Sequence, residues 1–526
     1  MNRLFASLLF LCFSTVALAD HPNIIFVLCD DLGYGDVACL NPECKIKTPH
    51  MDRVAAEGMM FTDAHSGSAV CTPTRYGVLT GRYAWRSKLQ RSVLGGLSPR
   101  LIEQGRMTVA SFLKSEGYHT ACIGKWHLGM DWHVNDGKTV NELSIESAEQ
   151  VWNVDYSQPI KNGPNSVGFD YYFGISASLD MVPYTFIEDD HVTVLPTEDK
   201  SFAMMLGRTP GTTRKGPTAP GFDANQVLPT LTEKAVAYVK SRAKAAKKGA
   251  PFFLYLPYAS PHTPILPTGE WVDASGLNPY ADFVMQTDDG IGQVLAALDE
   301  TGLADNTLII VTSDNGCSPQ AKFEELAAKG HHPSYHFRGH KADIYDGGHR
   351  VPYLVRWPGK VQAGSTSDQT ICLTDLMATC ADIVGRKLPD SAGEDSVSLL
   401  PAFLGKAKAP LREAVVHHSI DGSFAIRQGE WKLELCPGSG GWSAPRPNVD
   451  TSSGPAVQLY NLANDIGEQD NVQGEHPEVV QKLTQLMEKY AAQGRSTPGE
   501  AQANATEVNV HAAGEQAHAP KKKKGK

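Results

Sequence analysis

A cysteine and an arginine stand four residues apart in segment 71–75, which reads C-T-P-T-R. Pro73 suits the first turn of a helix, where its missing N–H is not needed, and Gly81 is suited to end that helix. Cys71 and Arg75 would then share one face at the helix N-terminus, where backbone N–H groups favour an anion. A buried structural cysteine is the commoner outcome for an isolated Cys. Taken alone, the segment allows either a nucleophile acting on a charged ester or a structural thiol.

Four short apolar runs have the character of buried parallel strands, and each ends in polar side chains. The runs cover residues 23–29, 120–124, 251–256 and 307–312. They lead, in that order, into Asp30 and Asp31, into Lys125 and His127, into His262, and into Asp314 and Asn315. Helices predicted over 48–58 and 108–117 separate the strands. Because ligands bind beyond the carboxyl ends of parallel strands, we expect these side chains to meet at one edge of the sheet, as in an enzyme.

The residue types at this edge complement one another. One group offers oxygen ligands that suit Ca²⁺ or Mg²⁺ better than zinc: Asp30, Asp31, Asp314 and Asn315. A second group can carry positive charge or transfer protons: Arg75, Lys125, His127, His262 and Lys341. Each residue taken singly is better explained as a surface charge or a capped turn. Together they would bind an anionic tetrahedral ester and protonate its leaving oxygen.

With these motifs in place, the chain resembles the type I sulfatases of the alkaline-phosphatase superfamily, nearest to arylsulfatase A-like and N-acetylgalactosamine-6-sulfatase-like members. The matching segments occur in family order over roughly residues 20 to 490: 23–36, 71–82, 124–129, 261–264, 312–316, 338–341, 346–352 and 459–471. There are two departures from the family pattern. Thr74 stands where the family usually has Ser, and Asp346 where Glu is usual.

The resemblance implies an α/β fold, with a large central, mostly parallel sheet flanked by helices as in alkaline phosphatase. A smaller C-terminal α+β subdomain with an antiparallel sheet is implied as well. Within it we predict strands at 414–418, 423–427, 431–435 and 458–460, and a helix over 477–493. The domain prediction is a signal peptide at 1–19, a catalytic domain at 20–407, the subdomain at 408–495 and a disordered tail at 496–526.

The resemblance further implies that a formylglycine-generating enzyme oxidises Cys71 to formylglycine. One hydroxyl of the hydrated aldehyde would attack sulfur, and the second would later expel sulfate. One Ca²⁺ would be held by the modified Cys71 together with Asp30, Asp31, Asp314 and Asn315.

The remaining residues receive roles from the same resemblance. Arg75 would hold the hydrate, while Lys125 and Lys341 contact sulfate oxygens. His127 would be the base that releases sulfate, and His262, with Lys341, would protonate the leaving alcohol.

The implied protein is an exported, calcium-dependent sulfatase acting on sulfate esters, most directly those of a sulfated carbohydrate. Two alternatives stay open. One is a phosphonate or phosphate monoester hydrolase of the same superfamily. The other is a non-catalytic protein that binds sulfated glycans, which would follow if Cys71 remained a thiol.

Composition limits the partners and the compartment. A net charge of -10 argues against nucleic acid, and no run of about 18 apolar residues follows the signal peptide, so we expect no transmembrane segment. Ten cysteines include Cys12 of the signal peptide. Among the others, the pairs 39–44 and 372–380 are candidate local disulfides in an oxidising compartment, with the connectivity open.

A group of histidines precedes Lys341: His331, His332, His336 and His340. The group is compatible with a zinc site, but no cysteine accompanies it. We favour a loop that lines the anion pocket and contacts substrate.

Overall fold

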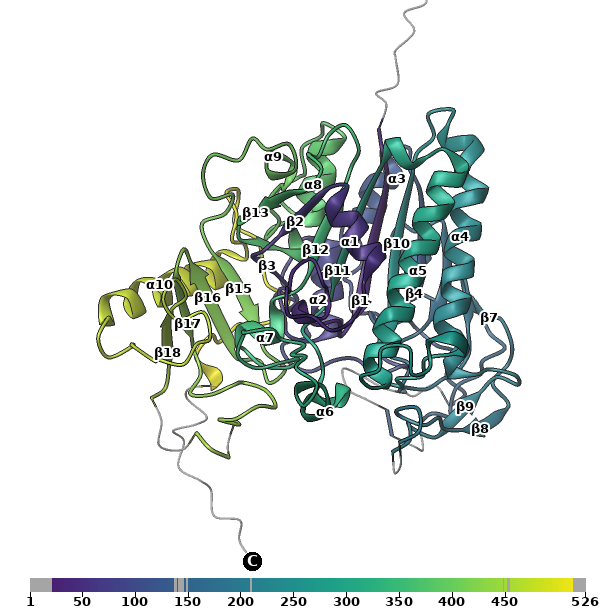
Figure 1. Ribbon diagram of the computed structural model, residues 1–526, viewed down its shortest axis with the longest axis horizontal. Coiled ribbons are helices and arrows are strands. Elements are labelled where there is room, and N and C mark those ends of the chain that lie inside the picture. The colour runs from purple at the N-terminus through teal and green to yellow at the C-terminus, as the bar shows by residue number, and fades with distance from the viewer. Residues whose placement is uncertain are drawn as a thin grey trace, which may run out of the picture.

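The structure is a computed structural model that describes residues 21–136, 140, 146–147, 150–208, 211–447, 449–451 and 455–513. Its centre is a ten-stranded mixed sheet in the order β13-β2-β12-β11-β1-β10-β4-β5-β6-β7 (Figure 1). The bounds are β1 Asn23–Asp30, β2 Met59–Phe61, β4 His119–Lys125, β5 Tyr171–Ile175, β6 Ile187–Glu188, β7 His191–Val192, β10 Phe252–Pro261, β11 Thr307–Ser313, β12 Tyr353–Arg356 and β13 Ser365–Ser367. The predicted signal peptide lies outside the described residues.

Five adjacent strands of this sheet, β11, β1, β10, β4 and β5, run parallel. Ile24 of β1 lies between Phe253 of β10 and Leu308 of β11, which fixes the register of the centre. Every residue of β1, β10 and β11 is buried, as expected for parallel strands covered on both faces. All four strands predicted from apolar runs are confirmed.

Helices flank the sheet. The bounds are α1 Pro49–Ala56, α2 Cys71–Thr80, α3 Val109–Ser115, α4 Val227–Ala246, α5 Pro279–Thr301, α6 Phe323–Ala327, α7 Asp346–His349, α8 Leu376–Ile383 and α9 Leu400–Phe403. The long helices α4 and α5 pack on each other and on β10, and α1 lies against α5 (Figure 1). A second group consists of α2, α3 and α8, which contact one another. Two small pairs complete this part: β3 (Ala64–His65) with β14 (Ile371–Cys372), and β8 (Glu198–Lys200) with β9 (Gly216–Thr218).

Helix α2 begins at Cys71 and ends, as predicted, before Gly81. Gly81 has φ +63°, a left-handed conformation that glycine adopts without a steric penalty. A Cβ added at Gly81 would lie 2.8 Å from the Cα of Gly393. Glycine is therefore needed at the end of α2 for two reasons: its left-handed conformation and its close approach to the backbone of Gly393.

Replacing Gly81 by alanine is expected to lower the free energy of unfolding by about 2–3 kcal/mol, because strain and overpacking add. Chemical denaturation measures the change. Gly105→Ala is the matched control, since Gly105 has φ +78° with no atom within 4 Å of the added Cβ. We expect only about 1 kcal/mol there, and equal losses at the two positions would contradict the packing argument.

The C-terminal part contains an antiparallel sheet of four strands, β15-β16-β17-β18, and helix α10 (Figure 1). The bounds are β15 Val415–His418, β16 Phe424–Gln428, β17 Trp431–Glu434, β18 Gln458–Asn461 and α10 Pro477–Gln493. Leu483 and Met487 of α10 are buried in a core shared with this sheet. The predicted large sheet and smaller antiparallel sheet are both confirmed.

Two sequence-based expectations differ from the structure. Residues 496–513 are not the disordered tail predicted there: the Arg82 side chain donates to the Ala503 carbonyl (2.7 Å), and the Ala505 N–H donates to the Arg86 carbonyl (2.7 Å). Two buried arginines thus hold a segment whose composition is typical of disorder. Residues 514–526, which include the lysine run, lie outside the described residues.

The expected local disulfides are also absent from the described residues, where all nine cysteines are free. Cys44 donates to the Ile46 carbonyl instead of pairing with Cys39. Cys372 and Cys380 are packed into two different apolar cores. In the described ranges, no helix combines the length and apolar character needed to cross a membrane.

Candidate active site

The side chains at the strand ends converge as predicted, and carboxylates form the centre of the cluster. Ligand atoms of Asp30, Cys71 and Asp314 lie within 4.8 Å of one another, as do ligand atoms of Asp30, Asp31 and His262. Asp30 ends β1, Asp31 follows it directly, and Asp314 follows β11, the neighbouring strand. The position of the cluster at the carboxyl edge thus follows from parallel pairing.

Two buried oxygens in this cluster have no hydrogen-bond partner among the described residues: Oδ1 of Asp30 and Oδ1 of Asn315. The amide group of Asn315 donates to Asp31 Oδ1 (2.7 Å), which turns its own oxygen away from that carboxylate. Buried polar atoms normally have partners, so these two oxygens indicate a binding partner that the described residues do not supply. Three carboxylates and an amide oxygen fit a hard cation such as Ca²⁺.

Three buried cations balance the carboxylates. Arg75 donates twice to Asp314 Oδ2, at 3.0 and 2.7 Å, and once to the Lys125 carbonyl, at 3.0 Å. Lys125 Nζ donates to Asp30 Oδ2 at 2.6 Å, and Lys341 Nζ to Asp31 Oδ2 at 2.8 Å. Three positively charged side chains thus face the three carboxylates of the cluster.

The pKa values reflect this crowding. Burial and the Asp30 charge raise the pKa of Asp314 to about 7. Burial alone would raise the pKa of Asp30 too, but Lys125, His262 and Arg75 hold it well below its usual range. Burial raises the pKa of the Cys71 thiol, against the opposing charges of Lys125 and Lys341. An unmodified Cys71 is therefore a poor thiolate nucleophile.

The histidines are oriented by their neighbours. His127 has φ +56°, and its Nε2 donates to the Leu94 carbonyl at 2.7 Å, which leaves Nδ1 as a lone pair without a partner in the described chain. Burial and the charge of Lys125 hold the pKa of His127 well below its usual range, so the ring is neutral. His262 Nδ1 donates to the Thr263 carbonyl (2.6 Å), and its Nε2 lies 3.7 Å from Asp31 Oδ2. His127 can therefore accept a proton at Nδ1, and the His262 ring is held beside the Asp31 carboxylate.

Sequence reasoning missed Ser178 and left Asp180 without a role. Ser178 Oγ accepts from Lys125 Nζ at 3.1 Å and lies 3.3 Å from the His262 ring, so it joins two site residues. Asp180 accepts from Arg214 through Oδ2 (3.0 Å), while its buried Oδ1 has no partner in the described chain. Both residues follow β5, a short strand that pairs in parallel with β4, and the strand-end argument would have found them.

The histidine group before Lys341 does not come together. His331 is buried and pairs with Asp36 at 2.8 Å, whereas His332 and His336 are exposed. His340 Nδ1 contacts the Lys341 carbonyl at 2.9 Å. The group is therefore no zinc site in the described chain, and His331 supports the loop of Asp36, whose Oδ2 accepts from the Gly33 N–H.

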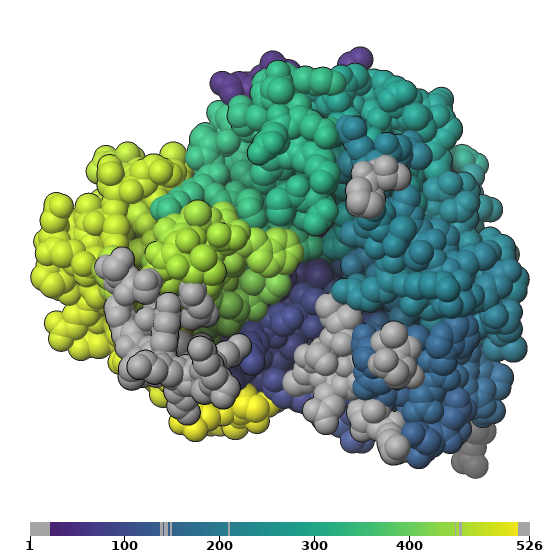
Figure 2. All heavy atoms as spheres, turned by 90° about the horizontal axis from the view of Figure 1, so that it is seen from below, coloured from purple at the N-terminus to yellow at the C-terminus, as the bar shows by residue number. Residues whose placement is uncertain are grey.

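One face of the molecule is hollowed. Seen from below, purple atoms from the first part of the chain lie at the bottom of a hollow between teal atoms and green to yellow-green atoms (Figure 2). Distant parts of the sequence therefore surround one depression.

Comparison with known proteins agrees with this geometry. The sulfatase family model matches residues 22–386. An N-acetylgalactosamine-6-O-sulfatase from Bacteroides thetaiotaomicron is 33% identical over 506 residues, covering 89% of this chain and 93% of the relative. Human arylsulfatase A is 31% identical over 510 residues, covering 91% and 90%.

A solved structure is similar over nearly its whole length. It is described under the metabolism of multiple glycosaminoglycans by Bacteroides thetaiotaomicron and labelled 6S-sulf. The TM-score is 0.76 at 31% identity, covering 90% of this chain and 99% of that one. The chain belongs to the sulfatase family. It is a sulfuric ester hydrolase with the alkaline-phosphatase-like fold.

Proposed function

We propose that this chain is an exported, calcium-dependent sulfatase that acts on a sulfated carbohydrate through a formylglycine formed from Cys71. The observation that carries the proposal is the meeting of Cys71 with Asp30 and Asp314 within 4.8 Å, at the N-terminus of a helix and beside two buried lysines. Such a site binds a tetrahedral anion and places a nucleophile next to it. Export rests on the apolar segment at 1–19.

Each residue of the site would have its own role in the reaction. Lys125 and Lys341 would bind sulfate oxygens and offset the charge that develops as the ester bond breaks. The free lone pair of His127 Nδ1 suits the base that removes a proton from the second hydroxyl. His262 would donate its proton to the leaving alcohol. Ca²⁺, held by Asp30, Asp31, Asp314 and Asn315, would supply positive charge beside the nucleophile.

As the substrate we propose a carbohydrate carrying 6-O-sulfated N-acetylgalactosamine or galactose. This assignment is supported by the named bacterial relative, at 33% identity over most of both chains. The similarity to arylsulfatase A, at 31% identity, requires that aryl sulfates be tested beside sugars.

The test begins with mass spectrometry of the peptide that contains Cys71, from a host with the maturation enzyme. Conversion to formylglycine lowers the mass by about 18 Da, because an aldehyde replaces the CH₂SH group. The same preparation is then assayed on 6-O-sulfated N-acetylgalactosamine, an aryl sulfate, a phosphate monoester and a phosphonate. Sulfate release from the sugar supports the proposal. An intact thiol, or faster turnover of the phosphorus esters, would overturn it.

Asp180 is expected to bind a hydroxyl of the substrate through its unpartnered Oδ1. Asp180→Ala should lower kcat/KM for the sulfated sugar by about 10–100-fold, since a hydrogen bond to a charged group is worth about 1.5–3 kcal/mol. An aryl sulfate lacks sugar hydroxyls, so its kcat/KM should change much less. Asp190→Ala, at an exposed residue, is the control. Equal losses on both substrates would contradict recognition by Asp180.

A further inference from the structure

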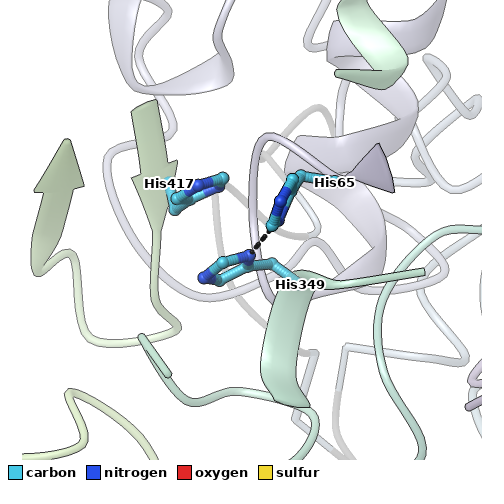
Figure 3. A group of neighbouring side chains, drawn as sticks. All are labelled: His65, His349 and His417. Carbon is cyan, nitrogen blue, oxygen red and sulfur yellow. Dashed lines mark hydrogen bonds between the residues drawn. The ribbon is translucent and has the colours of Figure 1, made fainter. Parts of the chain in front are cut away.

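Three histidines outside the catalytic cluster meet in the interior of the protein (Figure 3). His65 ends β3, His349 ends α7 and His417 belongs to β15, so each comes from a different element. All three are fully buried, and one ring nitrogen of each lies within 4.8 Å of the others. None of them has a role in the proposed reaction.

The hydrogen bonds assign the proton on His65. Its Nε2 lies 2.8 Å from Asp63 Oδ1. Arg427 Nη1 is 3.3 Å from the same nitrogen, but its closer partner is Asp63 Oδ1, to which it donates at 2.7 Å. Because a carboxylate only accepts, Nε2 carries the proton. In the neutral ring, Nδ1 is then a bare lone pair.

A similar argument assigns His349, whose Nε2 lies 3.0 Å from the Ile344 carbonyl. Lys432 Nζ is 3.2 Å from the same nitrogen, but its three protons are used on Ile344 O, Asp346 Oδ1 and Glu468 Oε1. Nε2 of His349 is therefore the donor to the carbonyl, and its Nδ1 is also a lone pair.

These two lone pairs face each other. Nδ1 of His65 and Nδ1 of His349 are 3.0 Å apart (Figure 3), a distance at which two acceptors repel unless a cation lies between them. A shared proton would supply that cation. Burial, however, lowers the pKa of His65 and holds that of His349 well below its usual range, and Lys432 and Arg350 add positive charge nearby.

His417 supplies a third nitrogen. Its Nε2 is buried and has no hydrogen-bond partner in the described residues, while its Nδ1 lies 3.4 Å from the Ser66 carbonyl. Each ring therefore has a carboxylate or a carbonyl at one nitrogen and a free nitrogen at the other. This is how metal-binding histidines are held in proteins, with the outer partner fixing the tautomer.

We propose that His65, His349 and His417 form a binding site for a zinc-type transition-metal ion, distinct from the oxygen-rich calcium site. Neutral imidazoles suit Zn²⁺ or Co²⁺ and do not suit Ca²⁺. Three nitrogens leave one position of a tetrahedral ion for water. The ion would link β3, α7 and β15, and so join the large domain to the C-terminal sheet. The site lies next to Ser66, in the segment that leads to Cys71.

Two adjustments accompany binding. The His65 and His349 nitrogens must separate by about 0.4 Å to reach the tetrahedral angle at a metal–nitrogen distance of about 2.1 Å. The His417 ring, now stacked on His349 at 3.7 Å and 6°, must rotate so that its Nε2 points at the ion. Rotation would give up the stacking on His349 and the Nδ1 contact with the Ser66 carbonyl, whereas Nε2 has no hydrogen bond in the described chain to lose.

The test uses the full-length protein, freed of metal by a chelator and then titrated with Co²⁺ in excess Ca²⁺. We expect one Co²⁺ per chain, with the visible absorption bands of a tetrahedral nitrogen-ligated ion. Zn²⁺ should displace it and raise the unfolding temperature. The excess Ca²⁺ occupies the carboxylate site, so that Co²⁺ binding there does not contribute to the measured spectrum.

Variants separate this site from surface binding. His417→Gln should abolish the tetrahedral spectrum, whereas His332→Gln, at an exposed histidine, should leave it unchanged. If the wild-type protein took up no Co²⁺, the proposal would be wrong. A proton shared between His65 and His349 would then explain their short distance. Uptake that persists in His417→Gln would overturn the proposal equally.

Discussion

Replacing Cys71 by alanine is expected to lower kcat/KM for any sulfate ester by about 10⁴-fold or more, because the nucleophile is lost while the binding groups stay. Cys71 is buried at the first position of α2, and Arg75, one turn on, is anchored to Asp314. Alanine lacks the sulfur atom and cannot be converted to formylglycine. Steady-state hydrolysis of an aryl sulfate measures the loss.

Cys71→Ser separates the formylglycine mechanism from simple nucleophilic catalysis. A serine has one hydroxyl, so it can accept a sulfo group but lacks the second hydroxyl that expels sulfate. We expect a burst of about one alcohol per active site followed by very slow turnover. Cys380→Ala, at another buried free cysteine, is the control. Sustained turnover by the serine variant would refute the role given to the second hydroxyl.

Replacing Asp314 by asparagine is expected to lower kcat/KM by more than about 100-fold. Groups that only orient a metal ligand cost about 10–100-fold when lost, and Asp314 is predicted to be a ligand itself. Its carboxylate also accepts two of the three hydrogen bonds that the Arg75 guanidinium donates, so that anchor is weakened as well. Excess Ca²⁺ should raise the unfolding temperature of the wild type but not that of the variant.

Asp288→Asn is a matched control for this change. Burial raises the pKa of Asp288 to about 7, as for Asp314, but Asp288 accepts from the backbone of His50 and Met51 on α1. Folded Asp288→Asn protein should keep both its response to Ca²⁺ and its kcat/KM. If Asp314→Asn retained the calcium response, the ligand assignment would be wrong.

From the sequence alone it was possible to predict which edge of the sheet carries the candidate site residues. Apolar runs that stop at Asp30, Lys125 and Asp314 predict parallel strands, and parallel pairing brings their carboxyl ends to one edge whatever the loops do. Pro73 and Gly81 likewise set the limits of α2 through local conformation alone. These inferences succeeded because periodicity and backbone preference are local properties.

Contacts between distant segments could be found only in the folded structure. Ser178, which follows the short strand β5, bridges Lys125 and His262. The segment after residue 495 has a disordered composition, yet its carbonyl and N–H groups pair with Arg82 and Arg86, more than 400 positions earlier. Hydrogen bonds of this kind depend on which backbone groups the fold leaves free, so they cannot be predicted from composition.

The buried histidines also show the difference between spacing along the chain and proximity in the fold. The sequence drew attention to the dense group at 331–340, whose members point to different partners. The structure instead gathers His65, His349 and His417, which are separated by up to 352 positions and lie on three elements. Spacing along the chain predicts metal ligands only where they share one local element, whereas these three meet because the C-terminal sheet packs against the large domain.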